Sequence, residues 1–534
     1  MKTIALNGCG LSLPKISQII FDGLRVTADP KAIKRMESSR RKIISETSAG
    51  KLIYGFNMGF GQNHNIHVDT ERLAQLQMNL IRSHSISFGE PTPREVVKLA
   101  MVLRANALLK GYSGVRSEVV YKLLEFINNQ NIYPFVPKIG SLGASGDLSP
   151  LSHIALNLIG EGQCFIKTPA GDYALTDAAS ALKKENIQPL QLEAKEGLAL
   201  NNGMQFTTAY LIMLLLRAEK MVVSSLALAA CFSEIMMATD RPFLPEIQEV
   251  RPYPGQQKAA HILFALLKDS RIIRSHRSPN RDKNTQDPYS SRCLPQIFGP
   301  VFDAIESTKD LLNIEINSAT DNPLVFDGAV VSGGNFHGMP LALAAANLFN
   351  AFCAQLKVKE ALVRRIVDKD KNRLDVSCLL DPDCDHQTSS GMMILEYSYH
   401  AISNLIMSYN NPAFLFSASS ASAQEDHVSH APTVILNLEK SLELFSYSLA
   451  LEDAMVCQGY NILVKMEKFF KRSGRISHAD RLLPGPIGSF IVEANKGVFT
   501  PIQVDTYLQP AVENIRQKII NQDIIYNFVQ GLIT

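Results

Sequence analysis

The sequence predicts a mainly α-helical protein built around a bundle of long helices. Two observations lead to this fold class. Apolar residues recur with helical spacing over long Ala-, Leu- and Met-rich stretches, and few segments alternate apolar and polar residues as strands do. The long stretches lie near residues 93–110, 206–238, 340–372 and 431–470. A helix of about 30 residues is about 45 Å long and must bury an apolar face along its length, so these helices are expected to pack against one another.

The composition is that of a globular protein with a large core. Of the 534 residues, 46% are hydrophobic and 19% are charged, which provides ample apolar material and lacks the signature of disorder. Lys and Arg number 53 against 51 Asp and Glu, a formal net charge of +2. Because binding to a phosphate backbone needs a basic excess, nucleic acid is not expected as a partner.

The cysteines indicate reduced thiols in the cytoplasm. Eight are scattered along the chain without a CxxC pair, so neither a disulfide framework nor a zinc cluster is expected. The nearest approach to a metal pattern is Cys378, Cys384 and His386, whose spacing is wider than in known sites, and no metal is expected. The few apolar residues before Asn7 are too short for a signal peptide.

One apolar stretch, 211–237, is similar to a membrane span in composition. Charged residues interrupt it before it reaches the roughly 18 apolar residues that a bilayer requires. These are Arg217, Glu219, Lys220 and Glu234. We therefore expect a buried core helix here and no membrane partner.

Loop-forming residues gather between the predicted helices and include most of the unusual polar residues. These loops are predicted at 55–66, 137–150, 275–298, 320–340 and 409–432. The polar stretch 164–194 is predicted to hold a short hairpin. We expect a loop-rich N-terminal domain, 1–200, and a second domain, 201–534, that contains the long-helix core and the C-terminal part.

A glycine-rich loop stands out at Gly140–Asp147, with three glycines in seven residues. A phosphate-binding loop needs Lys followed by Ser or Thr after its last glycine, whereas here Asp147 would repel an anion. A nucleophile elbow needs Gly where Asp147 stands and a preceding strand, and no strand is expected. On these residues alone, a glycine-rich helix-entry turn and a special backbone chemistry remain equal alternatives.

Ala144-Ser145-Gly146 resembles the triad from which the aromatic amino acid ammonia-lyase and aminomutase family builds a methylidene-imidazolone electrophile. In that family the Gly amide nitrogen attacks the Ala carbonyl, and two waters are lost. Gly146 has no Cβ to obstruct the bent backbone, Ala144 is small, and Ser145 supplies the methylene carbon. The resemblance implies a 4-methylidene-imidazole-5-one formed autocatalytically from Ala144, Ser145 and Gly146, with no external cofactor.

The resemblance continues over most of the chain, from Lys51 to about Asp453. Tyr54 occupies the family's inner tyrosine loop, which lies over the substrate. Asn202 matches the asparagine that contacts the prosthetic group, and Phe336 the residue that brackets its ring. The implied fold is the long-helix bundle of the ammonia-lyase/fumarase-like superfamily.

A second catalytic loop is implied at 286–293. Arg292 can grip a substrate carboxylate with two parallel hydrogen bonds. Gln286 adds a neutral donor and acceptor, and Tyr289 is the first choice for the base that removes a β-proton, with Tyr54 the second. Since a phenol titrates near pH 10, such a base needs its anion stabilised.

The substrate is expected to be L-histidine. Ser83-His84 disfavours a phenyl ring, although some tyrosine-acting members share this pair. Gln424 and Glu425 begin a string, Gln-Glu-Asp-His-Val-Ser, that is typical of histidine-acting members. A carboxylate accepts an imidazole N–H well, whereas beside a phenyl ring it would be an expensive unpaired charge. We expect elimination of ammonia to give trans-urocanate, and the alternative for Glu425 is a structural ion pair.

Three departures from the family pattern bear on this assignment. Asn201 and Met204 stand where the family more usually has an apolar residue and Thr, and Gly338-Met339 stands where histidine-acting members commonly have Ala-Glu. A lyase or aminomutase acting on tyrosine or another aromatic amino acid is therefore kept as the alternative. An inactive helical scaffold is the remote one.

The expected partners are a small amino acid substrate and further copies of the chain. Long apolar helices that one subunit can hardly cover, together with the family's architecture, predict a homotetramer with active sites shared between subunits.

Overall fold

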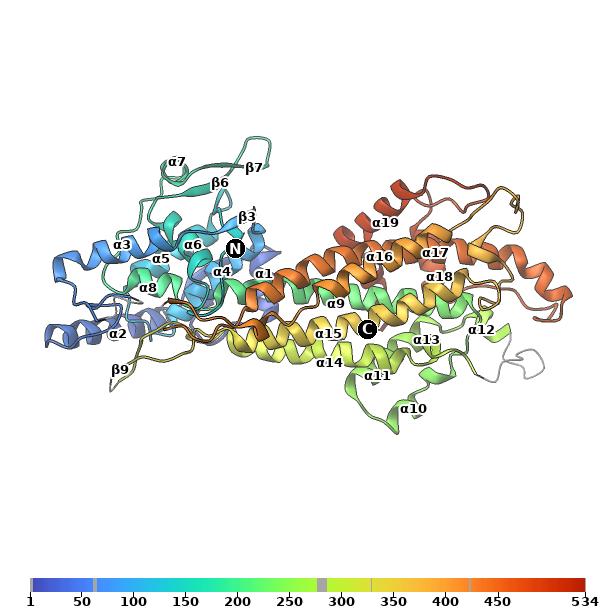
Figure 1. Ribbon diagram of the computed structural model, residues 1–534, viewed down its shortest axis with the longest axis horizontal. Helices are drawn as coiled ribbons and strands as arrows, with labels where there is room; N and C mark the ends of the chain where they lie inside the picture. The colour runs from blue at the N-terminus through green and yellow to red at the C-terminus, as the bar shows by residue number, and fades with distance from the viewer. Residues whose placement is uncertain (1–2, 61–64, 276–285, 328, 422–423, 534) are drawn as a thin grey trace. The chain divides into compact units, whose positions relative to one another are not determined.

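The computed structural model describes residues 3–60, 65–275, 286–327, 329–421 and 424–533. Helices dominate this part of the chain, and its strands are only two to five residues long. The predicted mainly α fold is therefore confirmed (Figure 1).

The four long predicted helices are all present. They are α4 (Arg94–Leu109), α9 (Gln205–Ile235), α15 (Met339–Val367) and α17 (Ala431–Arg472). Each begins within one residue of its predicted start, and each ends within five residues of its predicted end. Periodicity was sufficient here because apolar residues continue without Gly or Pro over several turns.

The chain divides into two compact units made of interleaved segments. Unit 1 comprises Met1–Met213, Thr308–Ala346 and Pro412–Leu436, and unit 2 comprises Leu214–Ser307, Asn347–Asn411 and Asn437–Thr534. The predicted domains, 1–200 and 201–534, are continuous in sequence, whereas these units are not. The predicted boundary stays a prediction.

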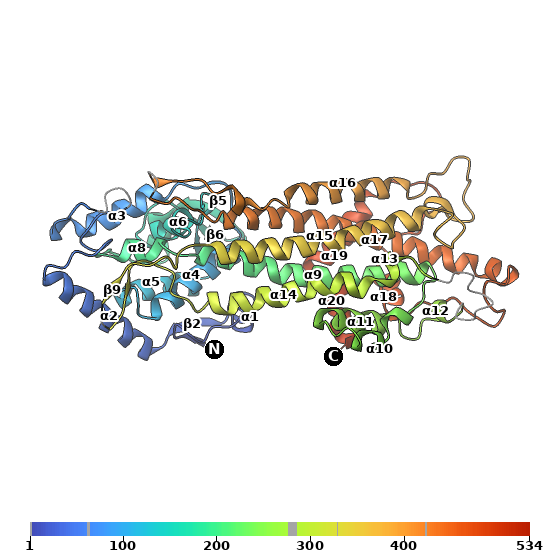
Figure 2. The same ribbon diagram turned by 60° about the horizontal axis from the view of Figure 1, so that its bottom comes forward.

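Unit 2 contains a bundle of long helices. Its portions of α9, α15 and α17 run side by side with α14 (Leu294–Glu315) and α16 (Met393–Tyr409) (Figures 1 and 2). Lys359 of α15 joins two neighbours, because its Nζ donates to the Ser225 carbonyl of α9 at 2.9 Å and pairs with Glu452 of α17 at 2.7 Å. All eight cysteines lie among the described residues, and none forms a disulfide.

Shorter helices complete unit 2. They are α10 (Pro245–Glu249), α11 (Pro254–Leu266), α12 (Arg271–Ser275), α13 (Tyr289–Arg292), α18 (Pro486–Ala494), α19 (Gln509–Gln522) and α20 (Ile524–Ile533), with the 3₁₀ turns Arg241–Phe243 and Ser377–Leu379. The predicted loop 275–298 is partly wrong. Its residues 289–298 lie mostly in α13 and the start of α14, while residues 276–285 lie outside the described part.

In unit 1, short helices surround α4, which is buried from Val96 to Leu109. These helices are α1 (Leu13–Ile20), α2 (Pro30–Ser48), α3 (Leu73–His84), α5 (Ser117–Asn128), α6 (Leu148–Leu158), α7 (Ala178–Lys184) and α8 (Glu196–Asn201), with the 3₁₀ turns Thr70–Arg72 and Ala413–Phe416. The burial of α4 explains its apolar sequence.

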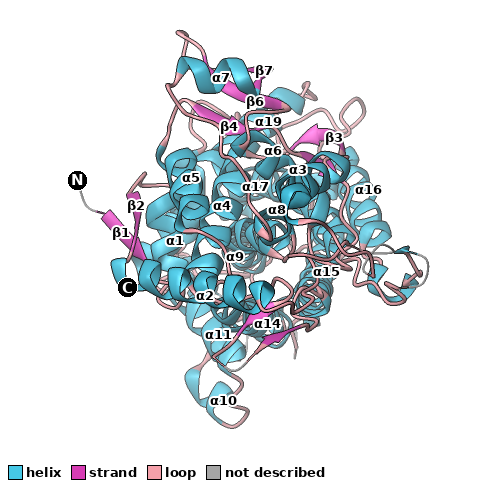
Figure 3. Cartoon of the chain, turned by 90° about the vertical axis from the view of Figure 1, so that its left-hand side faces the viewer, coloured by secondary structure: helices cyan, strands magenta, loops and turns pink. Residues whose placement is uncertain are grey.

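The described strands of unit 1 form four small sheets. β1 (Thr3–Leu6) is parallel to β2 (Arg25–Ala28), and β3 (Phe88–Pro91), β5 (Pro137–Ile139), β4 (Ile132–Pro134), β6 (Gln163–Lys167), β7 (Tyr173–Asp177), β8 (Leu324–Val325) and β9 (Val330–Val331) pair antiparallel as β3–β5, β4–β6–β7 and β8–β9. The hairpin predicted within 164–194 is confirmed as β6–β7, with Gln163 opposite Asp177 and α7 beside it (Figure 3).

One sequence argument was wrong in part. A strand, β5, does precede the glycine-rich loop, because Pro137–Ile139 pairs with the edge of β3. The nucleophile elbow is still excluded by Asp147, which occupies the position of the second glycine.

Of the described helices, one has the length and composition of a membrane span, and it is not α9. The stretch 211–237 lies mostly in α9, where all residues from Met221 to Ile235 are buried. α15 is long and apolar enough to cross a membrane, and half of its most apolar window is buried inside the protein. The core helix of a soluble protein has the same composition, so neither helix indicates a membrane span by itself.

Candidate active site

A pocket of about 950 Å³ in unit 1 gathers residues from six separate segments. Its walls include eight of the residues singled out in the sequence: Tyr54, His84, Ala144, Ser145, Asn202, Phe336, Gln424 and Glu425. Gly146 follows Ser145 directly. The loops that carry these residues therefore converge on one site, although they are up to about 370 positions apart in the sequence.

The glycine-rich loop is held in a sharp turn against the residue after Asn202. Gly146 has a φ of +82°, and a Cβ there would lie 2.4 Å from the backbone nitrogen of Gly203. Asp147 N–H donates to the Gly203 carbonyl at 2.7 Å. Only glycine fits position 146, since any side chain would both strain the backbone and displace Gly203. The loop also leads into α6 at Leu148, so it is a helix entry as well.

Asn202 fixes the same turn from the side and leaves one polar atom free. Its Nδ2 donates to the Ser145 carbonyl at 2.6 Å, and the residue is 4% exposed. Its Oδ1 is buried and has no hydrogen-bond partner. Because an unpaired buried amide oxygen costs about 1–3 kcal/mol, this atom is a ready acceptor for a group formed or bound beside Ser145.

Glu425 points at the serine of the triad. The Ser145 hydroxyl donates to Glu425 Oε1, and the Ser420 hydroxyl donates to Oε2 at 2.8 Å. Backbone hydrogen bonds between Ser420 and Glu425 close the turn that presents the carboxylate. Among the described residues, no Lys or Arg lies within ion-pair distance of Glu425, so the geometry does not show a structural ion pair.

His84 ends α3 and faces the same pocket. Its Nδ1 lies 3.0 Å from the Ser83 hydroxyl. Burial lowers the pKa of His84, and a hydrogen bond with the Leu80 backbone and the nearby charge of Glu425 oppose this shift in part. A neutral imidazole therefore lies beside the carboxylate at neutral pH.

Tyr54 lies in a turn that Asn57 organises. The Asn57 side chain accepts from Ile53 N–H at 2.7 Å and donates to the Lys51 carbonyl at 2.9 Å. Gly55, with a φ of +69°, lets the chain pass Leu198. The Tyr54 ring packs at right angles to Phe60, with the ring centroids 6.2 Å apart. The last glycine of this motif, Gly61, lies outside the described residues.

A buried polar network supports the floor of the pocket. Arg104 of α4 donates to the carbonyls of Ala199 and Asn202 at 3.0 and 2.8 Å. Asp147 accepts from Thr207 N–H at 2.8 Å and from the Ser141 hydroxyl at 3.0 Å. Burial raises the pKa of Asp147 to about 6 and lowers that of Arg104 to about 10, although these opposite charges partly offset both shifts.

The comparison with known proteins identifies the family. Residues 11–479 match the family model described as aromatic amino acid lyase. The chain belongs to the aromatic amino acid lyase family. The predicted family and the predicted enzyme class, a carbon–nitrogen lyase, are thereby confirmed.

Named relatives and solved structures of this family cover nearly the whole chain. Histidine ammonia-lyase of Halalkalibacterium halodurans is 39% identical over 82% of this chain and 85% of its own. Histidine ammonia-lyase of Geobacillus thermodenitrificans is 38% identical over 85% of this chain and 90% of its own. The crystal structure of histidine ammonia-lyase from Trypanosoma cruzi matches with a TM-score of 0.84 and 31% identity, covering 100% and 96%. The crystal structure of tyrosine aminomutase from Streptomyces globisporus matches with a TM-score of 0.87 and 26% identity, covering 99% of each chain.

Three predicted residues of this aromatic amino acid lyase lie outside the pocket. Gln286, Tyr289 and Arg292 belong to unit 2, and none of them lines the pocket of unit 1. Tyr289 begins α13 and is 71% exposed. Asp287 anchors this segment, since its carboxylate accepts from Thr239 N–H at 2.6 Å. The roles of the three residues stay predictions.

The departures from the family pattern have a structural context. Asn201 is fully buried, and its Nδ2 donates to the Ser152 hydroxyl of α6 at 3.1 Å. A Cβ at Gly338 would lie 2.6 Å from Cε of Met204. Asn201, Met204 and Gly338 do not line the pocket.

Sequence reasoning missed two parts of the site. Arg104 is the only charged residue between Lys98 and Lys110, and a single charge in such an apolar stretch indicates a buried partner. His337 and His427 also line the pocket, but the sequence motifs that contain them gave them no role.

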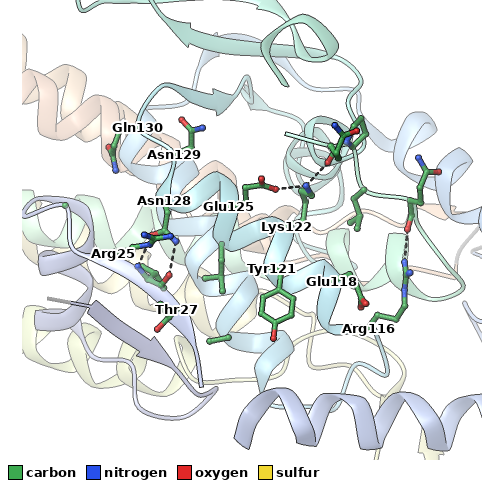
Figure 4. Close-up of a pocket in the computed structure, with 18 residues that line it drawn as sticks. Arg25, Thr27, Arg116, Glu118, Tyr121, Lys122, Glu125, Asn128, Asn129 and Gln130 are labelled. Carbon is green, nitrogen blue, oxygen red and sulfur yellow. Dashed lines mark hydrogen bonds and ion pairs between the residues drawn. The ribbon is translucent and has the colours of Figure 1, made fainter. Parts of the chain in front are cut away.

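A larger hollow of about 1260 Å³ lies on α5 in unit 1 and contains none of the predicted residues (Figure 4). Several of its polar side chains bind neighbouring groups. Lys122 binds Glu125 and the Gln188 carbonyl, and Arg116 binds the Gln191 carbonyl. Asn128 pairs with the backbone of Val26 in β2.

Proposed function

We propose that this chain eliminates ammonia from L-histidine to give trans-urocanate. The observation that carries the proposal is the position of Glu425, whose carboxylate reaches Ser145 in a pocket that also contains His84. A carboxylate with no cationic partner among the described residues is suited to accept the N–H of an imidazole. The relatives named histidine ammonia-lyase, at 36–39% identity, support the same substrate.

We infer that Ala144, Ser145 and Gly146 form the methylidene-imidazolone of this family. This group supplies an electrophilic carbon that accepts the substrate amine and makes it a better leaving group. The chain fits it in two respects: position 146 admits no Cβ, and the free Oδ1 of Asn202 lies in the residue that already binds the Ser145 carbonyl. Both features favour a bent loop at the triad, which would help the Gly146 nitrogen to reach the Ala144 carbonyl.

The other pocket residues would bind and orient the substrate. Glu425 accepts the imidazole N–H, and His84 and Gln424 supply further polar contacts. Phe336 packs against the prosthetic ring. Tyr54 lies in the wall where it can contact the substrate, and it is the second choice for the base.

We propose that unit 2 of another copy completes the site, in a homotetramer with shared active sites. Arg292 would bind the α-carboxylate in bidentate geometry, Gln286 would assist it, and Tyr289 would remove the β-proton. Two observations support this: none of the three lines the pocket of unit 1, and Tyr289 is 71% exposed. Such an assembly would be soluble and cytoplasmic.

A lyase or aminomutase acting on tyrosine is the second candidate. Ser83-His84, shared with some tyrosine-acting members, and the similarity to tyrosine aminomutase structures favour it.

An amino acid panel separates these functions. Purified protein is incubated with histidine, tyrosine and phenylalanine, and both ammonia and the absorbance of the conjugated acrylate are followed. We expect histidine to be turned over fastest. Faster turnover of tyrosine would contradict the proposed substrate, and a β-amino acid product would indicate an aminomutase.

A further inference from the structure

Two histidines from separate loops contact each other in the wall of the pocket. His337 follows Phe336, and His427 lies two residues after Glu425. Nε2 of His337 lies 3.3 Å from Nδ1 of His427 and 3.3 Å from the His427 carbonyl oxygen. The ring centroids are 5.3 Å apart, at an interplanar angle of 32°. The contact joins the tips of two loops that are 90 residues apart.

The surrounding hydrogen bonds define which ring nitrogen of His337 carries the proton. The Met339 backbone N–H donates to Nδ1 of His337 at 3.3 Å. Nδ1 is therefore the acceptor, and Nε2 carries the hydrogen of the neutral ring. Nε2–H then points at His427, where the backbone carbonyl oxygen and Nδ1 both lie 3.3 Å away and can share it. The pair is a directed hydrogen bond from His337 to His427.

The same two loops are joined at their bases through one carbonyl group. The Gly143 carbonyl accepts from Gly338 N–H at 3.3 Å and from the Ser429 hydroxyl at 2.9 Å. Gly143 directly precedes Ala144, so both bases are fixed to the loop of the triad. The tips are more exposed: residues 331–335 are all exposed, and so is His427. The histidine pair joins the loops at this exposed end.

We propose that His337 and His427 are positioning residues. Their hydrogen bond keeps the side chains of Phe336 and Glu425 in fixed positions relative to each other in the pocket. Each histidine lies within two residues of the group that it positions, so a shift of either tip is passed on to that side chain. This inference rests on the proposed function, because it assigns the benefit to recognition of an imidazole by Glu425. A misplacement of about 1 Å can lower a rate by about a hundredfold.

Paired Asn and Gln variants separate the hydrogen bond from the rest of each side chain. The amide of Asn lies where Nδ1 of histidine lies, and that of Gln reaches the position of Nε2. His337→Gln and His427→Asn therefore keep the link between the loops. His337→Asn breaks it, although Asn can still accept from Met339 N–H. His427→Gln removes the Nδ1 acceptor and leaves only the His427 carbonyl, so it weakens the link.

For each variant, kcat and KM are measured with histidine and tyrosine, together with the thermal midpoint. Rates are divided by the fraction of chains whose intact mass shows the loss of two waters. We expect kcat/KM for histidine to be about tenfold lower in His337→Asn than in His337→Gln, and lower by a smaller factor in His427→Gln than in His427→Asn. The preference for histidine over tyrosine should fall as well, and the thermal midpoints within a pair should agree.

A ¹⁵N NMR spectrum of the histidine rings gives a readout that is independent of activity. We expect a proton on Nε2 of His337 in the wild-type protein. A proton on Nδ1 would overturn the proposal, and so would equal losses of kcat/KM in the Asn and Gln variants.

Failure of the proposed function is recognised separately. If the wild-type protein does not act on histidine, the substrate assignment fails. In that case kcat/KM of the Asn and Gln variants is measured with the amino acid that the wild-type protein does accept. A lower value for His337→Asn than for His337→Gln, by about tenfold, would still support the positioning role.

Discussion

The thioether end of Met204 occupies the space that a side chain at position 338 would need. A Cβ on Gly338 would lie 2.6 Å from Cε and 3.2 Å from Sδ of Met204, and 2.7 Å from the Ser429 hydroxyl. Both positions depart from the family pattern, which more usually has Thr at 204 and, in histidine-acting members, Ala at 338. The two departures therefore concern the same space: Met204 fills part of it, and the Ser429 hydroxyl borders it as well.

The first prediction is that Gly338→Ala destabilises the protein and Met204→Thr restores it. The added methyl meets Met204 and Ser429, and such overpacking costs about 1–3 kcal/mol. Removing the thioether makes room, so the double variant should be more stable than Gly338→Ala alone. Denaturant unfolding of the four proteins gives the coupling energy. Additive effects would show that the two positions are independent.

The sequence predicts the regular parts of this protein better than its contacts. Long apolar periodicity was enough for α9 and α15, and polar residues between turn signals were enough for the hairpin β6–β7. α14 was not among the predicted long helices, and its residues 294–298 were predicted as loop; Pro295, Gly299 and Pro300 interrupt the helical pattern there. The surrounding packing tolerates them, since Leu294 and Phe298 are fully buried.

The convergence of the site residues could be expected only through the resemblance to the family. No local pattern relates Ser145 to Glu425, which are 280 residues apart, or His337 to His427. Such contacts arise from the tertiary fold, and a single sequence does not encode them as a period or a spacing. The same holds for Arg104, whose partners are backbone carbonyls of a distant segment.

The second prediction is that Glu425→Gln lowers histidine turnover by about ten- to a thousandfold, because the amide loses one acceptor and the negative charge that hold the imidazole N–H. Activity on tyrosine, if present, should change little. Asp426→Asn is the matched control, since Asp426 is the adjacent carboxylate in the pocket wall. Steady-state kinetics check this, and an equal effect of both substitutions would argue against a specific role for Glu425.

The third prediction concerns pH and Glu315. Burial, with a contribution from the charge of Asp147, raises the pKa of Glu315 to about 7. Because the folded-state pKa lies above the unfolded value, ionisation opposes folding. The free energy of unfolding should fall as the pH rises from about 4.5 to about 7. Glu315→Gln should remove this contribution. The free energy of unfolding of the variant, taken relative to that of the wild type, should therefore be about 1–3 kcal/mol higher at pH 8 than at pH 5.

Urea unfolding at both pH values measures this effect. Glu306→Gln is the control, because Glu306 lies on an exposed face of α14 and pairs with Lys258 at 3.5 Å. A stability difference between Glu315→Gln and wild type that stays constant between pH 5 and pH 8 would contradict the prediction.

The last prediction tests whether active sites combine residues from different subunits. Ser145→Ala removes the hydroxyl from which the electrophile is made, and Tyr289→Phe removes the preferred base, so each variant alone should lose about a hundredfold or more of its activity. When both chains are co-expressed, some pockets with Ser145 would receive unit 2 from a chain that carries Tyr289. Those sites contain both groups, and activity should return to a measurable fraction of wild type. Mixing the two purified, separately assembled proteins is the control, because stable oligomers do not exchange subunits at once. A co-expressed mixture as inactive as the two variants alone, while light scattering shows mixed oligomers, would mean that each site takes both residues from one chain.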